Sequence, residues 1–136
     1  MKCLIVEDDF VCRKVLQSCL IDHGDCFIAV NGREAVHAFQ IALDEGAPYD
    51  LICLDIMMPE MDGHEALKAI RQIENDHGTE GLDGVKIIMT TALDDPKNAM
   101  GAFKAGCQSY IVKPIVKEKL LEEIEKLGLL SISNKN

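Results

Sequence analysis

The chain has 136 residues, with 14 lysines and arginines against 23 aspartates and glutamates, and a formal net charge of -9. This length fits one domain with its own core, and the shares of hydrophobic (48%) and charged (27%) residues are typical of a globular protein. The acidic balance argues against direct binding to nucleic acid or to an anionic membrane surface, because both attract clustered lysine and arginine.

The apolar runs and the cysteines indicate a cytoplasmic protein. No run approaches the ~20 apolar residues of a membrane span, so we expect no membrane insertion, and Glu7 brings charge too early for a signal peptide. The six cysteines contain no C-x-x-C pair, which disfavours a zinc site or a thioredoxin-type motif. We expect free, mostly buried thiols, as is usual in a reducing compartment.

Five apolar runs alternate with five segments of helical periodicity. The runs at 3–6, 51–54 and 85–89 are nearly continuous in apolar character, which is typical of strands buried on both faces. The runs at 26–30 and 109–112 are weaker, and we expect them near the edges of the sheet. This alternation predicts right-handed βαβ units, and therefore an α/β fold with a parallel sheet between two helix layers.

Four of the helical segments carry an apolar stripe. The stripes are Cys12, Val15, Leu16, Cys19 and Leu20; Ala35, Ala38, Phe39 and Ala42; Leu67, Ile70 and Ile73; and Leu120, Leu121, Ile124 and Leu127. A shorter helix is expected to begin at Pro96, after an N-cap at Asp95, and to end at Gly106. The stretch 75–84 is rich in glycine and polar residues, which predicts a surface loop.

Polar residues follow four of the five strands, at the edge where an open parallel sheet binds its ligands. They are Glu7 and Asp8 after the first strand, Asp55 after the third, Thr90 and Thr91 after the fourth, and Lys113 after the fifth. The three carboxylates repel one another, and a hard divalent cation such as Mg²⁺ or Mn²⁺ relieves that repulsion. With a lysine and a hydroxyl beside them, they predict phosphoryl transfer in which Asp55 is the nucleophile and forms an aspartyl phosphate.

Six segments of the chain resemble the receiver domains of bacterial two-component response regulators. They are LIVEDD at 4–9, NGREA at 31–35, LDIMMPEMDG at 54–63, TTA at 90–92, AG at 105–106 and KP at 113–114. They stand in the family's order, and the D-x-x-M-P-x-M-D-G string from Asp55 to Gly63 is the most specific of them. The resemblance implies a flavodoxin-like (βα)5 fold, doubly wound in three layers, with strand order 2-1-3-4-5.

The resemblance also implies a role for each residue of the site. Asp55 would be the phosphoacceptor, and Lys113 would contact the phosphoryl group, oriented by a cis bond to Pro114. The metal ligands would be Asp8, Asp55, Glu7 through a water molecule, and the backbone carbonyl of Met57.

Two further residues match the switch of this family. Thr91 would move toward the phosphoryl group, and Tyr110 would follow it and remodel the face of the fourth helix, fifth strand and fifth helix. Thr90 is then interpreted as an ordinary strand residue, and Asp9 lies just outside the pocket.

The ends of the chain suggest a stand-alone, CheY-like receiver at 1–128, followed by a short tail at 129–136 and no effector domain. The partners implied by the resemblance are a sensor histidine kinase or histidine phosphotransfer protein as donor and a downstream protein as target. We expect a signalling protein rather than an enzyme, although it would catalyse its own phosphorylation and dephosphorylation.

The chain departs from the family pattern at two places. The loop at 75–84 is longer than in many receivers, and we interpret it as a possible partner surface away from the site. Met57 and Leu93, two places after Asp55 and Thr91, offer no group that orients an attacking water molecule. The sequence therefore predicts a comparatively long-lived phosphoprotein.

Two other functions fit these residues less well. A phosphohydrolase of the haloacid dehalogenase type needs a second acid two residues after the nucleophile, where this chain has Met57. A flavin-binding module on the same sheet would place a phosphate beside carboxylates that repel it. A degenerate receiver is also disfavoured, because no group of the site is missing.

Overall fold

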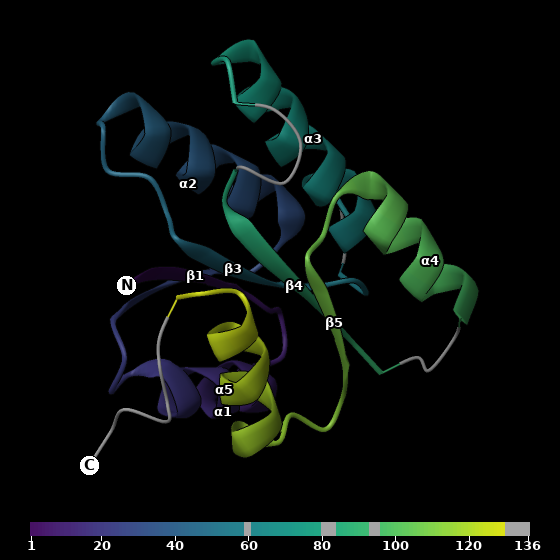
Figure 1. Cartoon of the computed structure of the whole chain (residues 1–136). Helices are drawn as coiled ribbons and strands as arrows, with labels where there is room; N and C mark the ends of the chain where they lie inside the picture. The colour runs from purple at the N-terminus through teal and green to yellow at the C-terminus, as the bar shows by residue number, and fades with distance from the viewer. Residues whose placement is uncertain (59–60, 80–83, 93–95, 130–136) are drawn as a thin grey trace.

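The computed structural model describes residues 1–58, 61–79, 84–92 and 96–129 (Figure 1). The elements in chain order are β1 (Lys2–Val6), α1 (Phe10–Leu20), β2 (Asp25–Ala29), α2 (Gly32–Asp44), β3 (Leu51–Asp55), α3 (Gly63–Asp76), β4 (Lys86–Thr91), α4 (Pro96–Ala105), β5 (Ser109–Val112) and α5 (Lys117–Lys126). Leu93, Asp95 and all of the predicted tail except Leu129 lie outside the described residues.

The five strands form one parallel sheet in the order β2-β1-β3-β4-β5, which confirms the predicted topology. The two weak strands lie at the edges, as expected. The pairing brings Val6 level with Leu54, and Leu54 level with Met89, so the carboxyl ends of the three central strands lie at one edge. The residues that follow them are therefore close in space although they are far apart in sequence.

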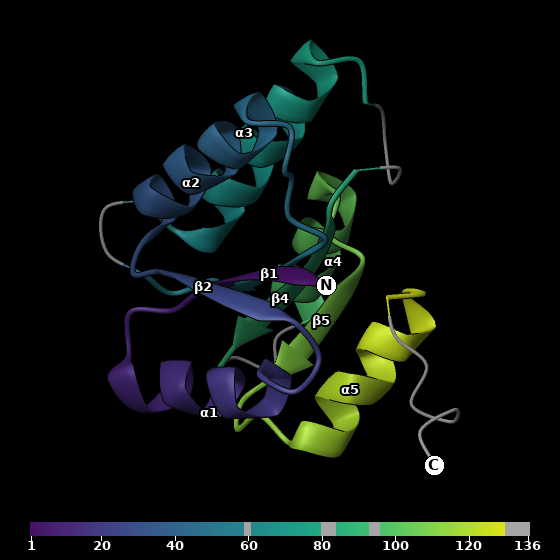
Figure 2. The same ribbon diagram turned by 90° about the vertical axis from the view of Figure 1, so that its left-hand side faces the viewer.

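Helices cover both faces of the sheet, as Figures 1 and 2 show from two directions. On one face, α2, α3 and α4 bury Phe39, Leu67 and Ala102 against the sheet. On the other face, α1 and α5 bury Leu20 and Leu120. Burial on both faces explains why the central strands are continuously apolar, because a strand with two covered faces has no polar side. None of the helices in the described ranges is long and apolar enough to cross a membrane.

Two local expectations were wrong. Val15 belongs to the predicted inner stripe of α1 but is 37% exposed, because the face of α1 that meets the sheet is carried by Leu16, Cys19 and Leu20. The helix α3 continues to Asp76, two residues into the predicted loop. Its helical hydrogen bonds extend to the following residue, because the His77 N–H donates to the Ile73 carbonyl. The six cysteines are free, and four of them are buried, as predicted.

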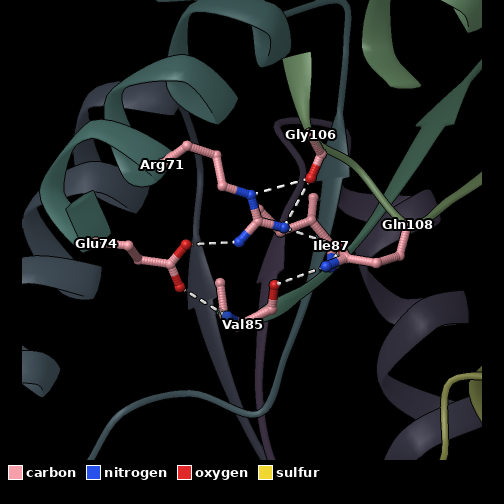
Figure 3. Close-up of polar contacts among 6 residues, drawn as sticks. All are labelled: Arg71, Glu74, Val85, Ile87, Gly106 and Gln108. Atoms are coloured by element: carbon pink, nitrogen blue, oxygen red, sulfur yellow. Dashed lines mark hydrogen bonds and ion pairs between the residues drawn. The ribbon is translucent and has the colours of Figure 1, made fainter. Parts of the chain in front are cut away.

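A buried polar network joins α3 to β4 and to the turn before β5 (Figure 3). Glu74 is 5% exposed and accepts hydrogen bonds from Arg71 (2.6 Å) and from the Val85 backbone N–H (2.7 Å). Arg71 also donates to the carbonyl of Gly106 (2.9 and 2.8 Å) and to Oε1 of Gln108 (2.9 Å). Nothing in the sequence indicated this network, because Glu74 meets Val85, and Arg71 meets Gly106 and Gln108, only in the folded chain.

We expect Arg71→Met to destabilise the protein by about 3 kcal/mol, because the substitution leaves the buried Glu74 carboxylate without its positively charged partner. Denaturant unfolding followed by circular dichroism measures the loss. The matched control is Lys126→Met, which removes ion pairs at the surface of α5 and should barely move the midpoint, since exposed pairs contribute little. Equal midpoints for Arg71→Met and the wild type would contradict the prediction.

Candidate functional site

Three carboxylates meet at the carboxyl edge of the sheet. Glu7 follows β1 and is fully buried, Asp55 ends β3 and is 3% exposed, and Asp8 is exposed. One oxygen from each of these side chains lies within 4.8 Å of the others. An all-oxygen donor set that is partly open to solvent suits a hard divalent cation, which takes one or two carboxylates and completes its shell with water. The residues present therefore fit the predicted metal.

Lys113 brings the positive charge to these carboxylates. Its Nζ lies 2.7 Å from Oε1 of Glu7 and 3.4 Å from Oδ1 of Asp55. Lys113 follows β5 and Glu7 follows β1, and the strands β4 and β3 lie between these two in the sheet. The ion pair therefore connects the ends of three strands. The sequence predicted Lys113 at this edge but not its close contact with Glu7.

Burial and neighbouring charges shift the pKa values of both Asp55 and Lys113. The pKa of the Asp55 carboxyl is raised from 3.8 to about 7, first by the loss of water around it and then by the neighbouring Glu7 charge, while Lys113 partly offsets both effects. Burial lowers the pKa of the Lys113 ammonium, but the carboxylates of Glu7 and Asp55 outweigh burial and raise it overall. The site therefore holds more negative charge than one lysine neutralises, which is the condition that favours binding of a cation.

Loop and cap residues hold the edge of the sheet in place. Asp9 does not join the carboxylate group, because its side chain is the N-cap of α1 and accepts a hydrogen bond from the Cys12 N–H (2.9 Å). Asp62 forms a capping box with Glu65 at the start of α3. Gly63 follows the cap, and a side chain there would collide with the backbone of Asp55. The Asp-Gly pair of the motif therefore starts α3 and places this helix against the end of β3.

The remaining predicted residues lie on β4, on β5 and in the loops that follow β3 and β5. Thr90 and Thr91 are both fully buried at the end of β4. Tyr110 is partly buried beside α4, with its ring centre 6.4 Å from that of Phe103. Met57 exposes 62% of its surface. The bond between Lys113 and Pro114 is cis.

The chain matches the response regulator receiver domain family over residues 3–125. It is 36% identical to the chemotaxis protein CheY of Bacillus subtilis over 125 residues, which are 90% of this chain and 93% of that protein. It is 37% identical to the probable transcriptional regulator ycf29 of Porphyra purpurea over 91% of this chain, but it spans only 54% of that longer protein.

Solved structures agree with this relationship. A chain of the CheX-CheY-BeF3-Mg+2 complex from Borrelia burgdorferi superposes with a TM-score of 0.82 at 26% identity, covering 94% of this chain and 89% of that one. Chemotaxis protein CheY4 of Vibrio cholerae gives a TM-score of 0.76 at 30% identity, covering 92% and 96% of the two chains. A family match over nearly the whole chain, the 2-1-3-4-5 sheet and the acidic edge agree with one another, and the chain belongs to the receiver domains of two-component signalling systems.

Proposed function

We propose that Asp55 is the phosphoacceptor of this receiver domain, with a phosphohistidine of a sensor histidine kinase or histidine phosphotransfer protein as the donor. The observation that carries the proposal is the buried Asp55 carboxylate, held between the carboxylates of Glu7 and Asp8 and the ammonium of Lys113. This arrangement supplies a nucleophile, a place for a cation and a fixed positive charge within one small volume.

In the proposed reaction an oxygen of Asp55 attacks the phosphorus, an O–P bond forms, and the N–P bond of the phosphohistidine breaks, so that the electron pair of that bond returns to the imidazole. Mg²⁺, when bound by Asp8, Asp55, the Met57 carbonyl and Glu7 through water, would stabilise charge on the phosphoryl oxygens. Lys113 would contribute to the same stabilisation from the side of β5.

The present contacts of Lys113 imply a rearrangement during this reaction. Its ammonium lies closer to Glu7 (2.7 Å) than to Asp55 (3.4 Å), and it has to turn toward Asp55 to meet a phosphoryl group there. Thr91 and Tyr110 would respond as the switch residues. The face that they would remodel carries exposed apolar side chains, which are Met100, Phe103, Val112 and Val116. Such a face suits a downstream protein target.

We further propose that the chain acts as a signalling receiver at 1–128 that catalyses its own phosphorylation and dephosphorylation, with the residues from 129 as a tail. Its six free cysteines support a reducing compartment, so the cytoplasm remains the proposed location. The exposed Met57 stands where a haloacid dehalogenase-type enzyme requires an acid, which favours the receiver over that alternative.

Phosphotransfer from purified histidine kinases, or from acetyl phosphate with Mg²⁺, should label the wild-type chain but not Asp55→Asn. The reason is that an amide nitrogen cannot replace the attacking carboxylate oxygen. Radiolabel on the protein band measures transfer, and Asp22→Asn, at an exposed position, is the matched control. Label on Asp55→Asn, or none on the wild type from any donor, would overturn the proposal. Sustained release of phosphate from small phosphomonoesters would instead favour the hydrolase.

We expect Asp55→Asn to unfold at a higher temperature than the wild type at about pH 8 without divalent cations. The pKa of Asp55 is about 7 in the folded chain against an ordinary value of 3.8, so the folded chain binds more protons between these values. The wild type therefore loses stability as the pH rises through this window, and the advantage of the variant should shrink toward pH 4. Scanning calorimetry at several pH values measures it.

The same measurement tests the metal ligands. Mg²⁺ should raise the unfolding temperature of the wild type at about pH 8, because a ligand that binds only the folded state stabilises it. Asp8→Asn should respond much less to Mg²⁺, since Asp8 is the exposed member of the carboxylate group. An undiminished response of that variant would exclude Asp8 as a ligand.

The exposed Met57 predicts slow loss of the phosphoryl group. Met57→Asn should shorten the lifetime of the phosphoprotein about tenfold, because a hydrogen-bonding side chain orients the attacking water. The decay of radiolabel after removal of the donor measures this lifetime. Met100→Asn, at a similarly exposed methionine on α4, is the control and should leave the decay unchanged. Rapid decay in the wild type that Met57→Asn leaves unaltered would contradict the prediction.

A further inference from the structure

Thr90 has a buried hydroxyl that has no hydrogen-bond partner within the part of the chain that the structure describes. The residue is fully buried, and among the described residues its Oγ1 is the buried side-chain oxygen or nitrogen that lacks a partner. Burying a hydroxyl without a partner is unfavourable, and valine fills the same volume without that cost. A structural role in the strand does not explain why this position has a hydroxyl group, so we looked for a functional role of the hydroxyl.

The strand register places Thr90 within the phosphoryl site. Thr90 pairs with Asp55 on β3 and with Ile111 on β5. Ile111 and Ile88, two residues before Thr90, both belong to the core on the side of α1 and α5. Because alternate residues of a strand share a face, Thr90 points to that same side. Glu7 and Asp55 stand two residues after Ile5 and Cys53, which belong to the same core cluster.

Thr90 lies next to the carboxylate that Lys113 contacts. The strand β4 lies between β5, which Lys113 follows, and β3, which Asp55 ends. The Lys113 ammonium nevertheless lies 3.4 Å from Asp55 and 2.7 Å from Glu7, on the far side of β4. Thr90 is the β4 residue at the level of Asp55 and on its face. Its side chain therefore lies beside that of Asp55, which the Lys113 ammonium contacts.

We propose that Thr90 is a positioning residue that holds the Lys113 ammonium for phosphoryl transfer. When the ammonium leaves Glu7 and turns back toward a phosphoryl group on Asp55, Thr90 Oγ1 accepts one of its three N–H groups. The others are then directed at the phosphoryl oxygens. The proposal rests on the proposed function of Asp55, and it gives the hydroxyl a partner in the state in which the reaction takes place.

Two substitutions separate the hydroxyl from the shape of the side chain. Thr90→Val keeps the volume and removes the hydroxyl, whereas Thr90→Ser keeps the hydroxyl. Initial rates of labelling by acetyl phosphate are measured over a range of donor concentrations with saturating Mg²⁺. We expect Thr90→Val to lower the maximal rate about tenfold, which is the effect of one lost hydrogen bond to a charged group, and Thr90→Ser to stay within about twofold of the wild type.

Two further readouts distinguish positioning from a structural effect. Calorimetric titration should give the same Mg²⁺ affinity for Thr90→Val and wild type, and the unfolding temperature of the variant should not fall. In a Lys113→Ala background, Thr90→Val should cause no further loss of rate, because a residue that acts through Lys113 has nothing left to position. Thr90→Ala serves in place of the valine variant if that one does not fold.

A wild-type rate in Thr90→Val, or a Thr90→Ser variant as slow as the valine variant, would overturn the proposal. So would a loss of Mg²⁺ affinity that parallels the loss of rate, or a full tenfold loss on top of Lys113→Ala. Failure of the proposed function gives a different result, because the wild type itself would then remain unlabelled by every donor.

Discussion

The contact between Lys113 and the carboxylates of Glu7 and Asp55 is the interaction on which the site depends. Two carboxylates are buried at the sheet edge, with Asp8 beside them at the surface, and a single ammonium compensates part of their charge. Burial raises the pKa of Asp55 to about 7, so its ionised form is maintained at a cost in the folded chain. In the function proposed above, a bound cation would compensate the remaining negative charge, which would explain why a stable fold contains so unfavourable an arrangement.

The parallel sheet is what makes that arrangement possible. Strand pairs in register bring the ends of β1, β3 and β4 to one edge, and the loops after them deliver their polar residues there. Gly63 and the Asp62 capping box seat α3 directly behind Asp55. At the opposite edge of the sheet, the Arg71–Glu74 network fixes the start of β4 to α3 and to the turn before β5. The start of β4 is therefore held both by α3 and by the turn before β5.

Local signals were reliable where a single pattern decided the structure. Continuous apolar runs predicted the buried strands, and the weaker runs at 26–30 and 109–112 were correctly placed at the edges. The predicted apolar stripe of α1 was wrong at Val15, which is exposed. Helical periodicity locates the buried face of a helix only to within about one residue on either side, and the packing of neighbouring elements decides which residues at the border of that face are buried. The extent of α3 was underestimated, because its last turn is polar and reads as a loop.

The sequence by itself determined the parallel α/β fold, the family, and the set of side chains at the functional edge. Each of these depends on periodicity or on residues adjacent to a strand end, which are local properties of the chain. Only the tertiary structure decided that Lys113 pairs with Glu7, that Glu74 is buried, and that the Thr90 hydroxyl has no partner among the described residues. These features depend on distances between segments up to 106 residues apart, which arise when the strands assemble and have no counterpart in local sequence.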